Sequence, residues 1–286
     1  MRNDFAVFIL SHGRPNNVAT VNLLKKSNYT GKWYIIIDNE DDKADEYYKI
    51  YKKRVIMFNK LEMASKFDVA DTQKDRRTVV YARNACFDIA KNLGLKYFLE
   101  LDDDYNKFSY RKEINGLLTQ RVNVLQADRI FNAMINFLEC TGAETVAFGQ
   151  GGDFVGGLSS GLYKQKVKRK AMNTFFLATE RRFDFVGRIN EDVNTYVCEG
   201  RKGKLFFTIS DVMINQKATQ SNAGGMTDVY ADKGTYLKSF YTVMMCPSCV
   251  KIAKMGNTDK RIHHNIEWEN AVPKILDEKW KKSAGN

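Results

Sequence analysis

Short apolar runs alternate with segments of helical periodicity along the first part of the chain. The runs are rich in β-branched and aromatic residues, which favours buried strands, and the segments between them repeat apolar residues at helical spacing. Strands are expected at Phe5–Leu10, Trp33–Ile37, Arg54–Phe58 and Lys96–Leu101. Helices are expected around Val18–Leu24, over Asp45–Lys53 and over Val79–Leu93, with Gly94 placed to end the last one. This strand–helix–strand order predicts a parallel sheet.

The second part of the chain has a less regular order of elements. An amphipathic helix is expected over Val124–Cys140, with its apolar face formed by Leu125, Ile130, Met134, Phe137 and Leu138. Strands are expected at Thr145–Phe148, Thr174–Ala178 and Leu205–Ser210, a mobile loop at Gln220–Thr227 and a helix at Tyr236–Met245. No repeat and no change of composition marks a linker, so we predict one α/β domain.

Composition adds a basic balance to this picture. The 286 residues are 44% hydrophobic and 12% aromatic, which allows a sizeable core and argues against intrinsic disorder. Lys and Arg number 45 against 34 Asp and Glu, a formal net charge of +11. Such a charge indicates an anionic partner, such as nucleic acid, an anionic membrane surface or a phosphorylated substrate. The alternative is a Lys-rich, solvated surface without a partner.

Neither the apolar runs nor the cysteines indicate export. Phe5–Leu10 is too short to span a bilayer, and no signal-peptide cleavage region follows it. The five cysteines are odd in number and scattered, which suits a reducing compartment, so we expect a cytoplasmic protein without a membrane partner. Cys246 and Cys249 form a Cys-x-x-Cys without a second pair for structural zinc, and a buried turn is expected there.

Polar clusters follow three of the expected strands at their carboxyl ends, at residues 11–15, 38–42 and 102–104. Ligands of open α/β sheets bind at this edge, so the three clusters are expected to converge on one crevice. Asp102, Asp103 and Asp104 repel one another unless a cation lies among them. Asp102 and Asp104 point the same way in an extended segment, which suits Mg²⁺ or Mn²⁺. The alternative is a solvated Asp-rich turn.

The Asp-x-Asp after a buried strand, together with the first loop Ser11–Pro15, resembles a GT-A glycosyltransferase. Tyr81–Asn84 near a helix start and Glu191-Asp192 within Gly187–Asp192 agree with that family pattern. More narrowly, the combination resembles phage glycosyltransferases associated with TET-type oxygenases, which are thought to glycosylate hydroxymethylated pyrimidines in DNA. The resemblance implies a mixed, mostly parallel central sheet flanked by helices. It also implies a Rossmann-like nucleotide half at about residues 1–105 and an acceptor half at about residues 106–286.

The resemblance also implies a donor site for a nucleotide sugar, expected to be a UDP-sugar. Asp102 and Asp104 would hold Mn²⁺ or Mg²⁺, and one residue of the pair His263-His264, expected to be His264, would be a further ligand. The residues expected to face the donor are Ser11, His12, Arg14, Asp38, Arg83 and Asp103. The two arginines would offset the diphosphate charge as forked donors. The alternatives are surface ion pairs for the arginines and a turn-packing role for His12.

Glu191 and Asp192 are the candidate catalytic residues. An acceptor hydroxyl is a poor nucleophile, so a carboxylate must take its proton during transfer. Asp192 is expected to be this base, with Glu191 as the neighbour that orients or binds the acceptor. The pair also suits an ordinary helix start, with Asn190 as the N-cap, and the two interpretations are compatible.

A basic run follows the Gly-rich segment Gly149–Gly161, which lacks the Lys-Ser/Thr of a P-loop and is expected to pass close to the donor sugar or the acceptor. The run consists of Lys164, Lys166, Lys168, Arg169 and Lys170. It could follow a phosphate backbone, with Tyr163 and Phe175–Phe176 available for base contacts. The alternative is an edge strand protected by lysines.

These observations favour a metal-dependent glycosyltransferase that modifies hydroxymethylpyrimidines in double-stranded DNA, located in the host cytoplasm if it is phage-encoded. The target base would have to leave the stack to be reached. Three alternatives remain. The same chemistry could act on a glycan or protein acceptor, and salt-sensitive DNA binding separates this case. A non-catalytic nucleic-acid-binding module would not need both carboxylate motifs. A metal-dependent nuclease or phosphatase would need a further carboxylate–histidine cluster.

Overall fold

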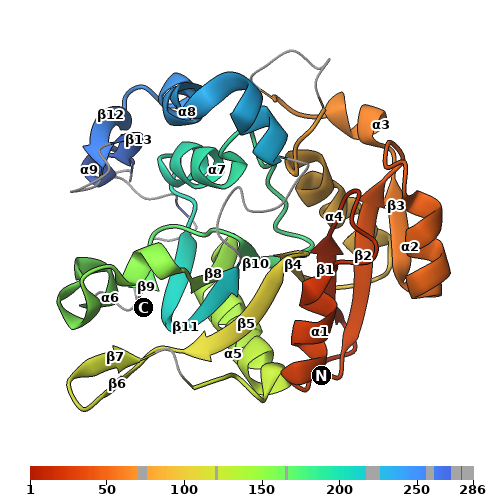
Figure 1. The fold of residues 1–286 in the computed structure, drawn as a ribbon. Helices are drawn as coiled ribbons and strands as arrows, with labels where there is room; N and C mark the ends of the chain where they lie inside the picture. Colours follow the sequence, from red (N-terminus) through yellow and green to blue (C-terminus); the bar gives the residue numbers. More distant parts are fainter. Residues whose placement is uncertain are drawn as a thin grey trace.

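The computed structural model describes residues 1–69, 76–119, 122–164, 167–216, 226–255, 261–271 and 278. Within these residues a nine-stranded sheet forms the centre of the molecule (Figure 1). Its strand order is β3-β2-β1-β4-β10-β8-β11-β5, with β9 paired to β11. The strands are β1 Phe5–Leu10, β2 Lys32–Asp38, β3 Val55–Phe58, β4 Tyr97–Asp102, β5 Tyr105–Tyr110, β8 Thr145–Gly149, β9 Val167–Lys168, β10 Thr174–Ala178 and β11 Phe206–Gln216.

The sheet is mixed and mostly parallel, as expected. Strands β3, β2, β1 and β4 are parallel, β10 runs antiparallel between β4 and β8, and β8 and β11 are parallel to each other. The edge strand β5 is antiparallel to β11. In the β1–β4 pair Leu10 lies beside Asp102, so the loop after β1 and the Asp run start side by side.

Helices cover both faces of the sheet (Figure 1). They are α1 Ala19–Lys26, α2 Ala44–Tyr51, α3 Lys60–Ala64, α4 Val80–Asn92, α5 Ala127–Thr141, α6 Gly161–Lys164, α7 Glu191–Gly200, α8 Met226–Met245 and α9 Trp268–Ala271. Strand β1 shows why its sequence is apolar throughout. Ala6, Phe8 and Leu10 belong to one hydrophobic cluster, whereas Phe5, Val7 and Ile9 belong to the other. A strand buried on both faces reads as a continuous apolar run.

The expected elements of the first part are present within a few residues of their predicted ends, and the differences lie mostly in the second part. Leu125, predicted on the apolar face of a helix, precedes α5 and is 58% exposed. Strand β11 continues past Ser210 to Gln216 because β5 pairs with its second half. Helix α8 starts at Met226, so residues 226–227 of the predicted loop are helical, and residues 220–225 lie outside the described residues.

Two hairpins lie outside the central sheet and were not predicted from the sequence. One consists of β6 (Lys112–Ile114) and β7 (Leu117–Thr119), joined by the two-residue turn Asn115-Gly116. The other consists of β12 (Val250–Met255) and β13 (Arg261–Ile266), against which α8 packs. The strands of the first hairpin have three residues each, which is too few for an alternating pattern to identify them.

The described residues include no helix that is both long and apolar enough to cross a bilayer. The five cysteines are all free. Cys246 and Cys249 are buried at the turn after α8, where Cys249 N donates to the Cys246 carbonyl, in agreement with the expected buried turn.

Candidate functional site

The loop after β1 is bonded to the Asp run after β4. Ser11 Oγ donates to Asp103 Oδ2 at 2.5 Å, and Arg14 Nη2 lies 2.9 Å from Asp103 Oδ1. The Tyr47 hydroxyl lies 2.7 Å from Ser11 Oγ and accepts from the Arg14 backbone N–H at 2.8 Å. Burial raises the pKa of Asp103 to about 6, although Arg14 and Ser11 work in the opposite direction. Three of the expected donor-side residues, Ser11, Arg14 and Asp103, therefore meet.

Asp38, at the end of β2, is a second centre of the same loop region. Its Oδ2 lies 2.9 Å from His12 Nδ1 and 3.2 Å from Lys60 Nζ, and its Oδ1 accepts from the Glu40 N–H at 3.1 Å. Burial by itself would raise the pKa of Asp38, but the hydrogen bond from His12 and the charge of Lys60 hold it below its ordinary value. The hydrogen bond to Asp38 raises the pKa of His12. The structure thus brings His12 and Asp38 together, as expected.

Lys60 is a member of this cluster that the sequence did not reveal. Its side chain is buried, and it starts α3 just after the end of β3, where Asn39 Oδ1 accepts from its backbone N–H at 2.8 Å. Its position in the sequence could have identified it, because residues that follow a parallel strand lie at the ligand-binding edge of the sheet.

Arg83, on α4, is buried and is the centre of a third cluster of charged residues. Its Nε donates to Glu191 Oε1 at 3.0 Å, and its Nη2 donates to Asp102 Oδ1 at 3.2 Å. Its Nη1 lies 3.5 Å from Glu100 Oε2, and the guanidinium lies 4.8 Å from the centre of the Phe175 ring. Burial works against the charged form, yet the neighbouring carboxylates hold the pKa of Arg83 well above its ordinary value. Arg83 is 2% exposed and paired with these three carboxylates, so the structure does not leave it open to the expected contact with a diphosphate.

Glu100 was also missed by sequence reasoning. It lies within the apolar run of β4, is fully buried, and its Oε1 has no hydrogen-bond partner. Burial raises the pKa of Glu100 to about 8, although Arg83 works in the opposite direction. A carboxyl inside an otherwise apolar strand was the signal that could have identified it, because buried acids are nearly always paired.

Asp102 lies at the border between this buried cluster and solvent. Its Oδ1 accepts from Arg83, its Oδ2 lies 3.0 Å from the Tyr105 hydroxyl, and its side chain is 31% exposed. Asp104 is partly buried in the turn between β4 and β5. Carboxylates at the border with solvent suit a divalent cation whose remaining ligands are water and phosphate oxygens. The donor set of Asp102 and Asp104 therefore fits Mn²⁺ or Mg²⁺.

The proposed third ligand lies on another element. His264 is on β13, and its Nδ1 is buried without a hydrogen-bond partner. Burial, with the nearby His263 and Lys238, lowers the pKa of His264 to about 4, so its imidazole is neutral at physiological pH. Among the described residues no three His, Cys, Asp or Glu side chains gather as a metal site. The structure therefore does not join His264 to Asp102 and Asp104, and its role as a ligand stays a prediction.

Glu191 and Asp192 form the first turn of α7, so the helix start expected there is present. Asn190 precedes it with φ 55°, but it makes no capping hydrogen bond, which differs from its expected role as N-cap. Its side-chain amide donates instead to the Lys238 carbonyl at 2.7 Å and to Thr242 Oγ1 at 3.0 Å, which ties α7 to α8. Burial and the adjacent Glu191 raise the pKa of Asp192 to about 7. Such a carboxylate suits a general base near neutral pH.

The basic run divides into exposed and buried members. Lys164 and Arg169 are exposed, whereas Lys168 is 3% exposed and burial lowers its pKa to about 8. Lys168 Nζ and Lys170 Nζ lie 3.9 and 2.5 Å from Asp153 Oδ1, so these two lysines balance a buried carboxylate of the Gly-rich segment. Lys166 lies outside the described residues.

The aromatic residues proposed for base contacts differ from expectation in the same region. Phe175 and Phe176 are 1% and 0% exposed on β10 and belong to the two core clusters, so they cannot stack on bases. Tyr163 is partly buried, with its ring centre 6.3 Å from that of Phe154. The structure shows that the apolar character of Phe175–Phe176 reflects a central strand buried on both faces.

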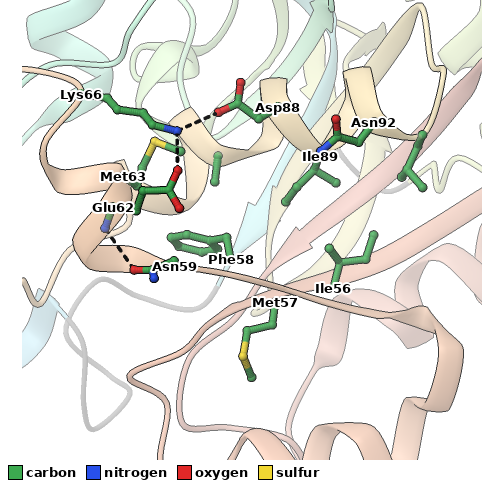
Figure 2. Close-up of a pocket in the computed structure, with 12 residues that line it drawn as sticks. Ile56, Met57, Phe58, Asn59, Glu62, Met63, Lys66, Asp88, Ile89 and Asn92 are labelled. Carbon is green, nitrogen blue, oxygen red and sulfur yellow. Dashed lines mark hydrogen bonds and ion pairs between the residues drawn. The ribbon is translucent and has the colours of Figure 1, made fainter.

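A pocket of about 300 Å³ lies between β3, α3 and α4. Figure 2 shows the side chains that line it. Its wall includes Met57, Phe58 and Ile89, and Lys66 at its rim lies 3.0 Å from Glu62 and 3.8 Å from Asp88. None of the site residues expected from the sequence lines it. The pocket is therefore separate from the candidate site.

The comparison with protein families agrees with the resemblance. A family model described as TET-Associated Glycosyltransferase matches residues 5–225. No curated protein is similar enough in sequence to match the chain. Two solved structures are weakly similar. The crystal structure of GalNAc-T7 with UDP, GalNAc and Mn²⁺ shares 12% identity at a TM-score of 0.39, over 74% of this chain and 43% of that one. The crystal structure of a putative UDP-N-acetylglucosamine pyrophosphorylase from Entamoeba histolytica shares 11% identity at a TM-score of 0.30, over 92% of this chain and 69% of that one. The chain thus spans less than half of the GalNAc-T7 structure.

Proposed function

Because the chain belongs to the TET-Associated Glycosyltransferase family, we propose that it moves a sugar from a UDP-sugar to the hydroxyl of a hydroxymethylpyrimidine in DNA. The observation that carries this proposal is the buried Arg83, which holds Asp102 at the end of β4 and Glu191 at the start of α7 at the same time. One guanidinium therefore fixes the proposed donor side relative to the first turn of α7, which carries the proposed base Asp192 next to Glu191. The matched residues 5–225 include every member of this arrangement.

On the donor side, Asp102 and Asp104 would hold Mn²⁺ or Mg²⁺, with His264 proposed as a further ligand. When bound, the cation would act as a Lewis acid on the diphosphate leaving group. Arg14, whose side chain is one third exposed beside Asp103, offers a forked donor to phosphate oxygens. His12 and Asp38 lie together at the end of β2, where they suit hydrogen bonds to the nucleoside.

On the acceptor side, Asp192 would take the hydroxyl proton as the oxygen forms its bond to the sugar carbon and the bond to the diphosphate breaks. With a pKa of about 7, the Asp192 carboxylate is basic enough to accept a proton and is still partly ionised near neutral pH. Glu191 is held by Arg83 Nε at 3.0 Å, so it would orient the acceptor rather than exchange protons. A hydroxymethylated base would have to leave the duplex stack to reach these groups.

For DNA binding, the basic run contributes through its exposed members. Lys164 and Arg169 are accessible to a phosphate backbone, and Lys166 is proposed with them from the sequence. Lys168 and Lys170 act through Asp153, since their charges hold the Gly-rich segment in its conformation. Phosphate contacts of this kind give affinity without sequence preference and weaken steeply with salt.

The test is to incubate the protein with UDP-sugars, Mn²⁺ and duplex DNA that contains or lacks hydroxymethylpyrimidines. UDP release and the mass of the digested nucleosides are followed together. Asp104→Asn is expected to abolish transfer, whereas Asp45→Asn, which changes an exposed carboxylate on α2, is the matched control and should retain it.

The outcomes separate the parts of the proposal. Absence of UDP release with every donor, even as hydrolysis, would overturn the transferase. UDP release without any modified nucleoside, combined with no salt-sensitive DNA binding, would overturn the DNA acceptor and favour a glycan or protein acceptor. Full activity of Asp104→Asn would remove the metal role.

A further inference from the structure

The β6–β7 hairpin extends from the end of β5, away from the body of the molecule (Figure 1). Ile114 and Leu117 form its last pair, and Asn115 and Gly116 between them have φ of 53° and 74°. Positive φ at both central residues is typical of the tight turn whose twist matches that of the flanking strands, and Asn-Gly is its preferred sequence. The turn therefore gives the tip a well-defined shape.

Apolar side chains occupy this tip. Leu117 is 73% exposed and Ile114 is 46% exposed, although they lie on opposite strands next to the turn. The Gly-rich segment adds Val155, which is 77% exposed, and β7 contacts the short helix Gly157–Ser159 of the same segment. Apolar groups that gather at a projecting tip indicate a surface that a partner covers.

Exposed cationic side chains lie at the base of this hairpin and on the same side of the molecule (Figure 1). Lys112 at the start of β6 is exposed, and its Nζ lies 4.9 Å from the centre of the Tyr110 ring. Lys164 on α6 and Arg169, the residue after β9, are exposed. Figure 1 shows α6 and β9 on the same side of the molecule as the hairpin. Glu113 is the acidic residue of the hairpin itself. An apolar tip with basic residues at its base suits a polyanion that has a groove.

The hairpin is connected directly to the candidate site. Strand β5 starts at Tyr105, immediately after the Asp run, and leads to the hairpin. At about 3.3 Å per residue, the chain from Asp104 to Ile114 spans at most about 33 Å. One turn of B-form DNA is about 34–36 Å long. The tip therefore reaches at most about one helical turn from a base bound at the site.

We propose that the β6–β7 hairpin is a docking arm that lies in the major groove of duplex DNA, up to about one helical turn from the target base. The major groove admits a two-stranded β-ribbon, and thymine methyl groups offer apolar contacts there to Ile114 and Leu117. Lys112 and the exposed members of the basic run contact the flanking phosphates. This inference rests on the proposed function in one respect, which is that the acceptor is duplex DNA.

The test measures the affinity of the intact protein for fluorescently labelled duplex DNA of about 30 base pairs at about 50 mM and about 200 mM salt. The double variant Ile114→Ser/Leu117→Ser is expected to bind roughly ten-fold more weakly with an unchanged salt slope, because it loses apolar burial but no phosphate contact. Lys112→Gln should instead lower the salt slope by about one. Leu61→Ser, which changes a leucine on α3 that is 58% exposed, is the matched control and should bind normally.

Duplex length gives a second readout. Removing about one helical turn, about 10 base pairs, from one side of the modified base should weaken wild-type binding and leave the double variant unaffected. Equal affinity of wild type and double variant for the duplex would overturn the docking arm. It would also be overturned if the wild type were a dimer and the double variant a monomer, because the tip would then be covered by a second copy of the chain. Duplex binding that depends on the hairpin without sugar transfer would support the arm and overturn the proposed function. UDP release without duplex binding would support the transferase and overturn the docking arm.

Discussion

The Asp run is flanked by two ion-pair clusters that differ in their access to water. The open cluster contains His12, Arg14 and Asp38, and the side chains of His12 and Arg14 are 47% and 33% exposed. The buried cluster surrounds Arg83, which is 2% exposed, and includes Glu100, which is fully buried. Asp102 and Asp103 are adjacent in sequence, yet Asp102 bonds to the buried cluster and Asp103 to the open loop.

The difference shows that burial and the neighbouring cations together, rather than residue type, decide which charge a carboxyl carries. In the open cluster, His12 and Lys60 hold the pKa of Asp38 below its ordinary value despite burial. In the buried cluster, burial raises the pKa of Glu100 to about 8, and near it the pKa of Asp192 is raised to about 7. The ionised groups of the open cluster are thus suited to binding a charged ligand. The carboxyls of the buried cluster are suited to binding and releasing a proton.

The largest expected effect is that of Arg83→Leu, which leaves Glu100, Asp102 and Glu191 without their common cation. Removing one partner from a buried ion pair costs about 3–5 kcal/mol, because an uncompensated charge remains. We expect a loss of this size in the free energy of unfolding, measured by urea denaturation, together with loss of sugar transfer. A loss below about 1 kcal/mol, typical of surface pairs, would show that the two clusters do not differ in this way.

Asp192→Asn should separate chemistry from stability within the buried region. Asn retains an acceptor for the Val193 N–H, which bonds to Asp192 Oδ1 at 2.7 Å, but cannot take a proton. We expect transfer to fall by about 10²–10⁴-fold, the usual contribution of a general base. In the wild type, kcat/KM should rise as the pH passes about 7.

Stability should change with pH in the opposite direction. The pKa of Asp192 is raised in the folded state from 3.8 to about 7, so its protonated form stabilises the fold below pH 3.8 and this contribution is lost as the pH rises to about 7. The wild type should therefore lose more stability than Asp192→Asn over this interval. Identical pH profiles of the two proteins would contradict the buried, proton-holding state of Asp192.

The smallest effect on stability is expected for His12→Ala in the open cluster. Asp38 retains Lys60 and the Glu40 N–H, and the His12 side chain is 47% exposed, so we expect a loss of less than about 1 kcal/mol in the free energy of unfolding. The pKa of His12 is raised above 6.5, so this loss should be largest below pH 6.5 and disappear as the pH rises through the raised value. UDP affinity, measured by calorimetry, should fall although the fold is retained. Unchanged affinity would argue against a role of His12 in donor binding.

The sequence named most residues of both clusters, but it indicated how the open cluster comes together and not how the buried one does. Ser11, His12, Asp38 and Asp103 directly follow apolar strands, and parallel strands bring such ends to one edge of a sheet. Glu191 and Arg83 are 108 positions apart in the chain, and no local pattern indicates that they meet. Lys168 likewise looks like any member of a basic run, although in the structure it is buried near Asp153.

The sequence by itself determined the parallel strands, the edge of the sheet at which polar residues gather, and the Asp-x-Asp and Glu-Asp motifs, because all of these depend on the period and order of nearby residues. Only the tertiary structure decided which charges are removed from water. It enclosed Arg83 among three carboxylates, withdrew Lys168 and Phe175–Phe176 from the surface, and left the β6–β7 tip exposed. Burial depends on how distant elements pack together, and packing sets both the pKa of a carboxyl and the groups that a ligand can reach.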